Sequence, residues 1–170
     1  MFPEPTAPAA NRAAVFLGYL DYFRDRAIDK VRGMPAAERH TSRLASGWTP
    51  LELLNHVRHV ERRWIEWRFE ARPLPDPWAD ELDGRWHVAP TETLDSVVAA
   101  LRTQAAHTRA VVERTDLSTL GAPGPDWPAA ELSGEPPTLE RVLFHLLQEY
   151  ARHLGQLDIV SELADGPVGE

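Results

Sequence analysis

Residues 49–64 read TPLELLNHVRHVERRW, a stretch that combines a helix start with an amphipathic helix. Thr49 precedes a proline at the first helical position, and Glu52 stands three residues later, which is the spacing of a capping box. Apolar side chains then recur at three- and four-residue steps, at Leu53, Leu54, Val57, Val60 and Trp64. The prolines that follow would stop the helix, at Pro73, Pro75 and Pro77. The stretch therefore predicts a helix that begins at Thr49 and ends before Pro73.

Three further segments show the same helical period. The first covers residues 11–32, the second follows Pro90 and continues to about Val112, and the third begins at the natural N-cap Thr138 and continues to Val160. The connections 72–90 and 115–137 are long and rich in proline, glycine and tryptophan, so they permit a crossover between helices. We therefore predict an all-α four-helix bundle with long crossover loops. Residues 1–10 are expected to form a flexible N-terminus, and residues 11–170 a single domain.

Composition excludes several classes of function. The 170 residues suit one domain, and the net charge of −8, from 18 basic and 26 acidic residues, disfavours nucleic acid as a partner. The absence of cysteine excludes disulfides, thiolate zinc sites and a cysteine nucleophile. No apolar run approaches the roughly 18 residues of a membrane span, and no secretory signal is present, so we expect a cytoplasmic protein without a membrane partner.

A row of polar side chains runs along the predicted last helix. His145, Glu149 and His153 are spaced by four residues, and Gln156 follows three residues later. Such positions share one helical face, and here they are embedded among apolar residues. Imidazole nitrogens and carboxylate oxygens are normal ligands of zinc and other divalent metals. If buried without a partner, each polar group would cost about 1–3 kcal/mol, so the row needs either hydrogen bonds or a metal.

A further ligand would have to come from another helix. His56 lies on the apolar side of the helix that begins at Thr49, so we expect it to face the interior. His59 is rotated from it by about 60° in a helix of 3.6 residues per turn, and it would either line the site or face solvent. Two interpretations stay open at this point. The histidines either bind a metal together with Glu149, or they are core histidines that hydrogen-bond to it without a metal.

Two motifs resemble a known family. The stretches LLNHVRHVERRW (residues 53–64) and HLLQEYARHLGQLDI (residues 145–159) resemble the DinB-like superfamily. They are similar to the branch that includes the mini-circle proteins and to the mycothiol-dependent maleylpyruvate isomerases. The resemblance implies a four-helix bundle with a crossover, a homodimer, and a three-ligand metal site at His56, Glu149 and His153. It further implies zinc, with nickel, iron or manganese as alternatives, and a low-molecular-weight thiol such as mycothiol. Gln156 and Ser161 depart from the closer branch, which often has histidine and arginine there.

The leading hypothesis is a metal- and thiol-dependent transferase or isomerase that acts on a small electrophile. His145, His59 and Gln156 would then support the metal ligands. Arg63, Arg152 and Trp86 are weaker candidates for substrate contacts, and for the two arginines solvated surface charges are the alternative. A second hypothesis is a non-catalytic dimer, stabilised by the metal, that binds a ligand or acts in a stress response. The third is a helical dimer without a metal.

Overall fold

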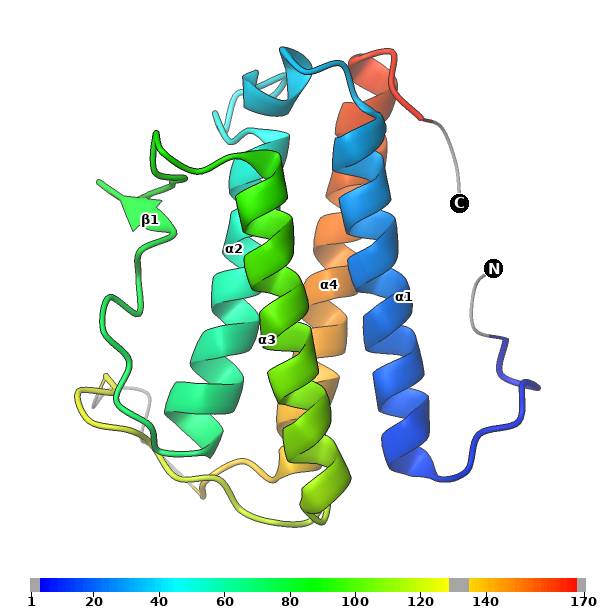
Figure 1. Ribbon diagram of the computed structural model, residues 1–170, viewed down its shortest axis with the longest axis vertical. Helices are drawn as coiled ribbons and strands as arrows, with labels where there is room; N and C mark the ends of the chain where they lie inside the picture. The colour runs from blue at the N-terminus through cyan, green and yellow to red at the C-terminus, as the bar shows by residue number, and fades with distance from the viewer. Residues whose placement is uncertain (1–3, 129–134, 168–170) are drawn as a thin grey trace.

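Four long helices pack into a bundle in the part of the chain that the computed structural model describes, residues 4–128 and 135–167 (Figure 1). They are α1 (Arg12–Gly33), α2 (Pro50–Arg62), α3 (Leu94–Arg114) and α4 (Leu139–Leu163). All four lie where the apolar period predicts them, and the all-α fold class is confirmed. No helix in the described residues is long and apolar enough to cross a membrane.

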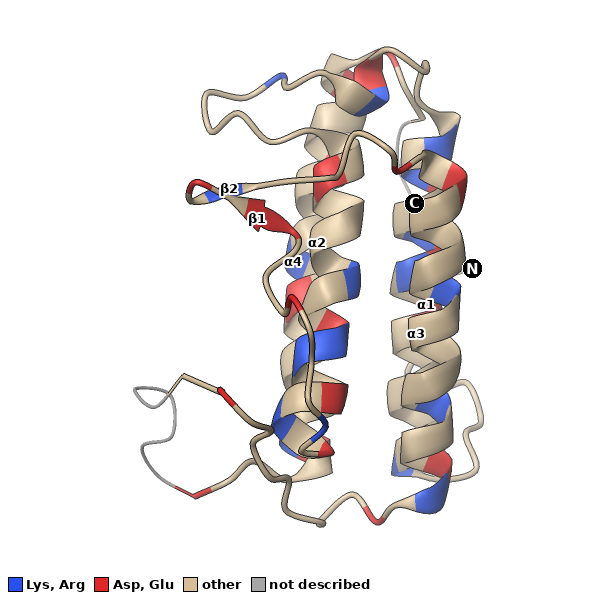
Figure 2. Ribbon diagram, turned by 60° about the vertical axis from the view of Figure 1, so that its left-hand side comes forward, with Lys and Arg blue, Asp and Glu red and all other residues tan. Residues whose placement is uncertain are grey.

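The order of the helices in space requires a crossover. In Figure 1, α1 and α4 run in one direction and α2 and α3 in the other, so the chain between α2 and α3 returns along the whole bundle. Figure 2 shows α2 and α4 as one layer and α1 and α3 as the other, and each of these pairs is in contact. The long segment 70–93 is therefore the crossover, and it covers the outside of α2 and α4.

The helix ends follow the local sequence. Thr49 accepts a hydrogen bond from the backbone of Glu52, whose carboxylate accepts one from the backbone of Thr49, so the predicted capping box is present. Thr138 caps α4 as predicted, and Thr93 forms a second capping box at the start of α3. These caps satisfy backbone donors that a helix leaves unpaired at its first turn. They fix the starting point, and hence the side-chain faces, of α2, α3 and α4.

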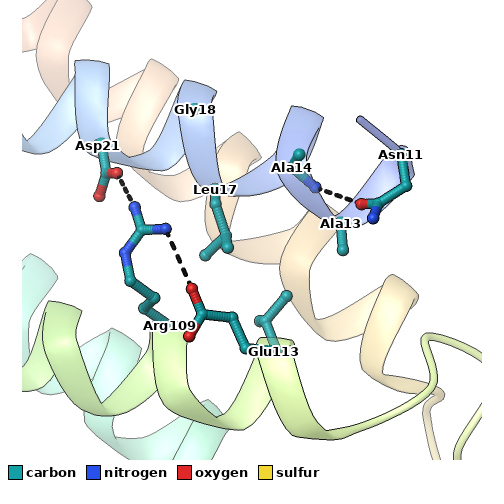
Figure 3. A pocket seen from close by; sticks show the side chains of 9 residues that line it. Asn11, Ala13, Ala14, Leu17, Gly18, Asp21, Arg109 and Glu113 are labelled. Atoms are coloured by element: carbon teal, nitrogen blue, oxygen red, sulfur yellow. Dashed lines mark hydrogen bonds and ion pairs between the residues drawn. The ribbon is translucent and has the colours of Figure 1, made fainter. Parts of the chain in front are cut away.

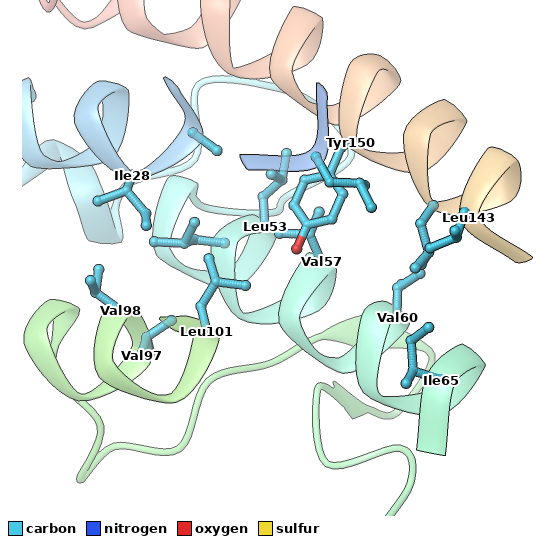
Figure 4. Packing of buried hydrophobic residues seen from close by; sticks show 14 of the residues in the cluster. Ile28, Leu53, Val57, Val60, Ile65, Val97, Val98, Leu101, Leu143 and Tyr150 are labelled. Atoms are coloured by element: carbon cyan, nitrogen blue, oxygen red, sulfur yellow. The ribbon is translucent and has the colours of Figure 1, made fainter. Parts of the chain in front are cut away.

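The core is formed by the predicted apolar faces. Figure 4 shows Leu53 and Val57 of α2 facing Tyr150 of α4, with Leu101 of α3 on the other side. The apolar row of α2, from Leu53 to Val60, is buried. Burial of this kind contributes roughly 25 cal/mol for each Å² of apolar surface removed from water. The hydrophobic stripe therefore supplies both the stability of α2 and the orientation of the residues between its members.

A buried charged cluster links all four helices at the centre of this core. The Glu61 carboxylate of α2 has no solvent exposure, and it accepts hydrogen bonds from Arg24 (3.0 and 2.7 Å), Thr108 (2.5 Å) and Tyr150 (2.6 Å). Burial, and then the adjacent Glu61 carboxylate, raise the pKa of Tyr150 well above its usual value. The phenol therefore stays protonated and donates. Such a cluster is costly to disrupt, so it fixes how the helices pack against one another.

Four short elements were not predicted. A π-helix, η2 (Arg63–Phe69), replaces the last turns of the helix predicted from Thr49, and a 3-10 turn, η1 (Glu38–His40), precedes α2. The crossover also contains a hairpin of β1 (Glu81–Leu82) and β2 (Arg85–Trp86), whose turn residues Asp83 and Gly84 both have positive φ. Strands of two residues are too short to show an alternating pattern.

The ends of the chain are only partly described. Residues 4–10 form no helix, and residues 1–3 and 168–170 lie outside the described residues, as does the stretch 129–134 of the second long loop. The expected division into a flexible segment 1–10 and one domain 11–170 stays a prediction.

Candidate metal site

The three residues proposed as metal ligands lie together. His56 of α2 and Glu149 and His153 of α4 each offer a ligand atom, and these atoms all lie within 4.8 Å of one another. The two imidazole rings meet edge to face, with centroids 5.1 Å apart. The four-residue spacing brings Glu149 Oε2 to 3.2 Å from His153 Nε2. Direct packing of α2 against α4 brings His56 to these two side chains, so one site is assembled from two helices.

The orientation of the His56 ring is fixed by Asp80. His56 Nδ1 donates to Asp80 Oδ2 at 2.9 Å. Burial opposes the ionisation of Asp80, but hydrogen bonds from His56 and Arg63 outweigh it and lower the pKa of the carboxyl to about 2. An ionised carboxylate only accepts, so Nδ1 carries the proton. His56 Nε2 is therefore left as the nitrogen that would bind a metal, as in other carboxylate–histidine–metal arrangements.

Asp80 is in turn held by Arg63. Arg63 donates from Nη1 to Asp80 Oδ1 (2.5 Å) and from Nη2 to Oδ2 (3.2 Å), and also from Nη1 to the carbonyl of Pro77 (2.9 Å). The guanidinium lies 4.3 Å from the centre of the Trp78 ring. Arg63 is thus buried and bonded to the crossover, rather than solvated. Asp80 itself has 1% of its surface exposed.

The second histidine is oriented in the same manner by its own helix. His153 Nδ1 lies 2.8 Å from Gln156 Oε1, and an amide oxygen can only accept, so Nδ1 donates. His153 Nε2 faces Glu149 Oε2 at 3.2 Å, and a hydrogen bond between these two atoms requires a second proton on the ring. The hydrogen bond with His153, which outweighs burial, lowers the pKa of Glu149 and keeps it anionic. Two electron-rich atoms at this separation require a proton or a cation between them, and this donor set therefore fits a divalent metal.

The other candidate residues lie at different distances from this site. His145 Nε2 is 3.8 Å from Glu149 Oε1, and its ring packs on Trp64 at 4.4 Å. Burial lowers the pKa of His145, which favours the neutral ring. His59 does not join the three ligand atoms. It is buried, its Nε2 contacts Arg58 at 2.5 Å, and burial followed by the charge of Arg58 lowers its pKa to about 4. Arg152 is exposed.

Trp86 covers the two histidines from the hairpin. Its ring stacks on His56 with centroids 4.3 Å apart and an interplanar angle of 18°, and it meets His153 nearly edge-on at 5.2 Å. The crossover therefore supplies two groups to the site, the carboxylate of Asp80 and the indole of Trp86. Trp86 was a weak candidate from the sequence. Asp80 was missed, because it lies in a loop without periodicity, 24 residues after its partner.

A different pocket, of 380 Å³, lies between α1 and α3 (Figure 3). Its charged groups are paired with one another, since Arg109 bonds to Asp21 and also approaches Glu113 at 3.6 Å. The remaining wall is mainly small and apolar, with Ala13 and Leu17. This pocket offers no converging set of ligand atoms, so the site between α2 and α4 is the stronger candidate for chemistry.

Comparisons with known proteins agree with this architecture. No curated protein matches the chain. The structure is similar to a crystal structure described as a conserved protein from Enterococcus faecalis, with a TM-score of 0.59 and 18% sequence identity over 94% of this chain and 100% of that one. At this identity the match shows the fold alone. The family model described as mycothiol-S-transferase matches residues 15–166.

Proposed function

Because this chain belongs to the mycothiol-S-transferase family, we propose that it transfers an electrophilic group to the sulfur of mycothiol at a divalent metal site formed by His56, Glu149 and His153. Family membership confirms the DinB-like resemblance of residues 53–64 and 145–159. In the proposed reaction a carbon–sulfur bond forms, the bond from that carbon to its leaving group breaks, and the thiol proton passes to solvent. Zinc is the proposed metal, and a homodimer the proposed assembly.

The observation that carries the proposal is the convergence of three ligand atoms within 4.8 Å. The Nδ1 atoms of both histidines are already engaged, by Asp80 and Gln156, so Nε2 is the ring nitrogen that each histidine has left for a metal. Two histidines and one carboxylate leave further coordination positions open, which is typical of catalytic rather than structural sites. A divalent ion held there would lower the pKa of a coordinated thiol, so that thiolate is present at neutral pH.

The protein's own residues prepare the site for this chemistry. Asp80 and Gln156 hold the two imidazoles in the orientation that binding requires, which removes the entropic cost of ordering them on binding. Trp86 covers the two rings and excludes water from that side. The chain has no cysteine, so the sulfur nucleophile must come from a cosubstrate. This agrees with the use of a free thiol.

The experiment is a metal analysis followed by a conjugation assay. Protein purified without a histidine tag is expected to contain stoichiometric divalent metal, and to conjugate mycothiol to at least one electrophile of a panel. His153→Ala should lose both the metal and the activity, whereas His40→Ala, at an exposed position, should keep both. Metal-replete protein that conjugates nothing would refute the proposal. A large loss of melting temperature in His153→Ala, without any activity in the parent protein, would favour a metal-stabilised binding protein instead.

A further inference from the structure

A second cavity, of 280 Å³, adjoins the proposed metal site. It lies between the chain segment before α2 and the hairpin of the crossover, and we call it the Trp48–Trp86 pocket. The residues that define it are Ser46, Gly47, Trp48, Glu52, Gly84, Arg85 and Trp86. It is slightly smaller than the roughly 300–1,000 Å³ of pockets that hold drug-sized ligands, so its capacity is about that of a single ring with its substituents.

One indole separates this pocket from the metal ligands. The rings of Trp48 and Trp86 lie 5.8 Å apart at an interplanar angle of 47° and form two of its walls. The Trp86 ring also stacks on His56 at 4.3 Å. A molecule in the pocket would therefore contact the same side chain that covers the proposed site. A ligand with one end at the metal and the other in the pocket needs a linker only about as long as an indole is wide.

The polar groups of the pocket favour an uncharged, hydroxyl-rich ligand. Glu52 uses one carboxylate oxygen, Oε2, to cap the backbone of Thr49 at 2.8 Å. Arg85 is exposed, and its side chain reaches toward Gly47. The carboxylate accepts hydrogen bonds and the guanidinium donates them, so together they serve hydroxyl groups while their charges cancel. The two indoles offer flat apolar surfaces for the C–H face of a ring.

We propose that the Trp48–Trp86 pocket binds the first sugar ring of mycothiol, an inference that rests on the proposed transferase function. Mycothiol joins a cysteine derivative through an amide bond to an amino sugar that carries an inositol ring. Its thiol and its first sugar ring are separated by little more than one amino-acid residue. The thiol can then lie at His56 and His153 while the sugar lies beyond Trp86. The pocket selects mycothiol over charged peptide thiols such as glutathione, because those lack the hydroxyl-rich ring.

The test compares two substitutions of one wall. Trp48→Leu keeps an apolar side chain but removes the aromatic face, and it should raise the KM for mycothiol roughly tenfold. Trp48→Phe keeps an aromatic face and should stay within about threefold of the parent. The KM for the electrophile and the metal content should not change in either variant. Arg85→Ala tests the polar wall at an exposed position where folding is not at risk, and exposed Arg12, at the start of α1, provides the matched control Arg12→Ala.

Direct binding separates this inference from the proposed function. Glucosaminyl-inositol, the mycothiol fragment without cysteine, is titrated by calorimetry into the parent and the variants. Binding to the parent that is lost in Trp48→Leu or Arg85→Ala, and kept in Arg12→Ala, supports the pocket even if no conjugation is detected. Absence of binding to the parent overturns the inference. So does a mycothiol KM that is unchanged in both Trp48→Leu and Arg85→Ala, in which case the proposed transferase function would still stand.

Discussion

Replacement of Glu61 with leucine should destabilise the bundle by about 3–5 kcal/mol, because it leaves a buried arginine without its carboxylate. Arg24 has 1% of its surface exposed and donates twice to Glu61. One further contact, from Arg24 to Asp21 at 2.9 Å, remains and places the expected loss toward the lower end. Thr108 and Tyr150 also lose their acceptor. For a chain of this size, 3 kcal/mol corresponds to a fall in Tm of roughly 6–12 °C.

The measurement is urea unfolding followed by far-ultraviolet circular dichroism. The double variant Arg24→Met with Glu61→Leu should recover part of the lost stability, because it removes the unpaired buried arginine while Thr108 and Tyr150 stay without their acceptor. Glu162→Leu, at an exposed position of α4, should change the free energy of unfolding by less than about 0.5 kcal/mol. A loss below about 1 kcal/mol for Glu61→Leu, or a double variant as unstable as the single one, would refute the assigned role of this cluster.

Three further substitutions test the site and its helix. Asp80→Asn should lower metal affinity by about 10–100-fold, measured by competition with a chromophoric chelator, because His56 loses its anionic partner. Gly155→Ala should stabilise α4 by about 0.5–1 kcal/mol in thermal melts, since an added Cβ would contact nothing within 4 Å. His59 has a folded pKa of about 4, below its usual 6.5, so the unfolded chain takes up its proton first as the pH falls. Stability of the metal-free protein should therefore decrease from pH 6.5 to 4, by up to about 3 kcal/mol, and less so in His59→Asn.

Each of these predictions has its own control. Asp83→Asn changes an exposed aspartate of the same crossover, and an equal loss of metal affinity in that variant would contradict the role of Asp80. Destabilisation by Gly155→Ala would mean that another surface covers this face of α4. If His59→Asn loses as much stability between pH 6.5 and pH 4 as the parent protein does, this loss is not due to His59.

The helices and the clustering of His56, Glu149 and His153 could be predicted because both depend on local spacing. A four-residue interval places Glu149 beside His153 in any α-helix, and the apolar stripe of α2 turns His56 inward. Asp80 could not be found in this way, because its contact with His56 depends on where a long crossover passes. The sequence did not show that Arg63 is buried, for a related reason. It begins a π-helical segment, and only the folded crossover supplies its partners.

The crossover that supplies Asp80 and Trp86 would limit how fast a metal ion bound at this site exchanges with solution. The bundle holds His56, Glu149 and His153 through its core, whereas the two groups that support and cover them belong to a segment outside it. Local opening of such a segment requires much less free energy than unfolding of the helices. Release of a bound ion would then follow the opening rate of residues 70–93, and hydrogen exchange of their amides would report it while the core amides remain protected.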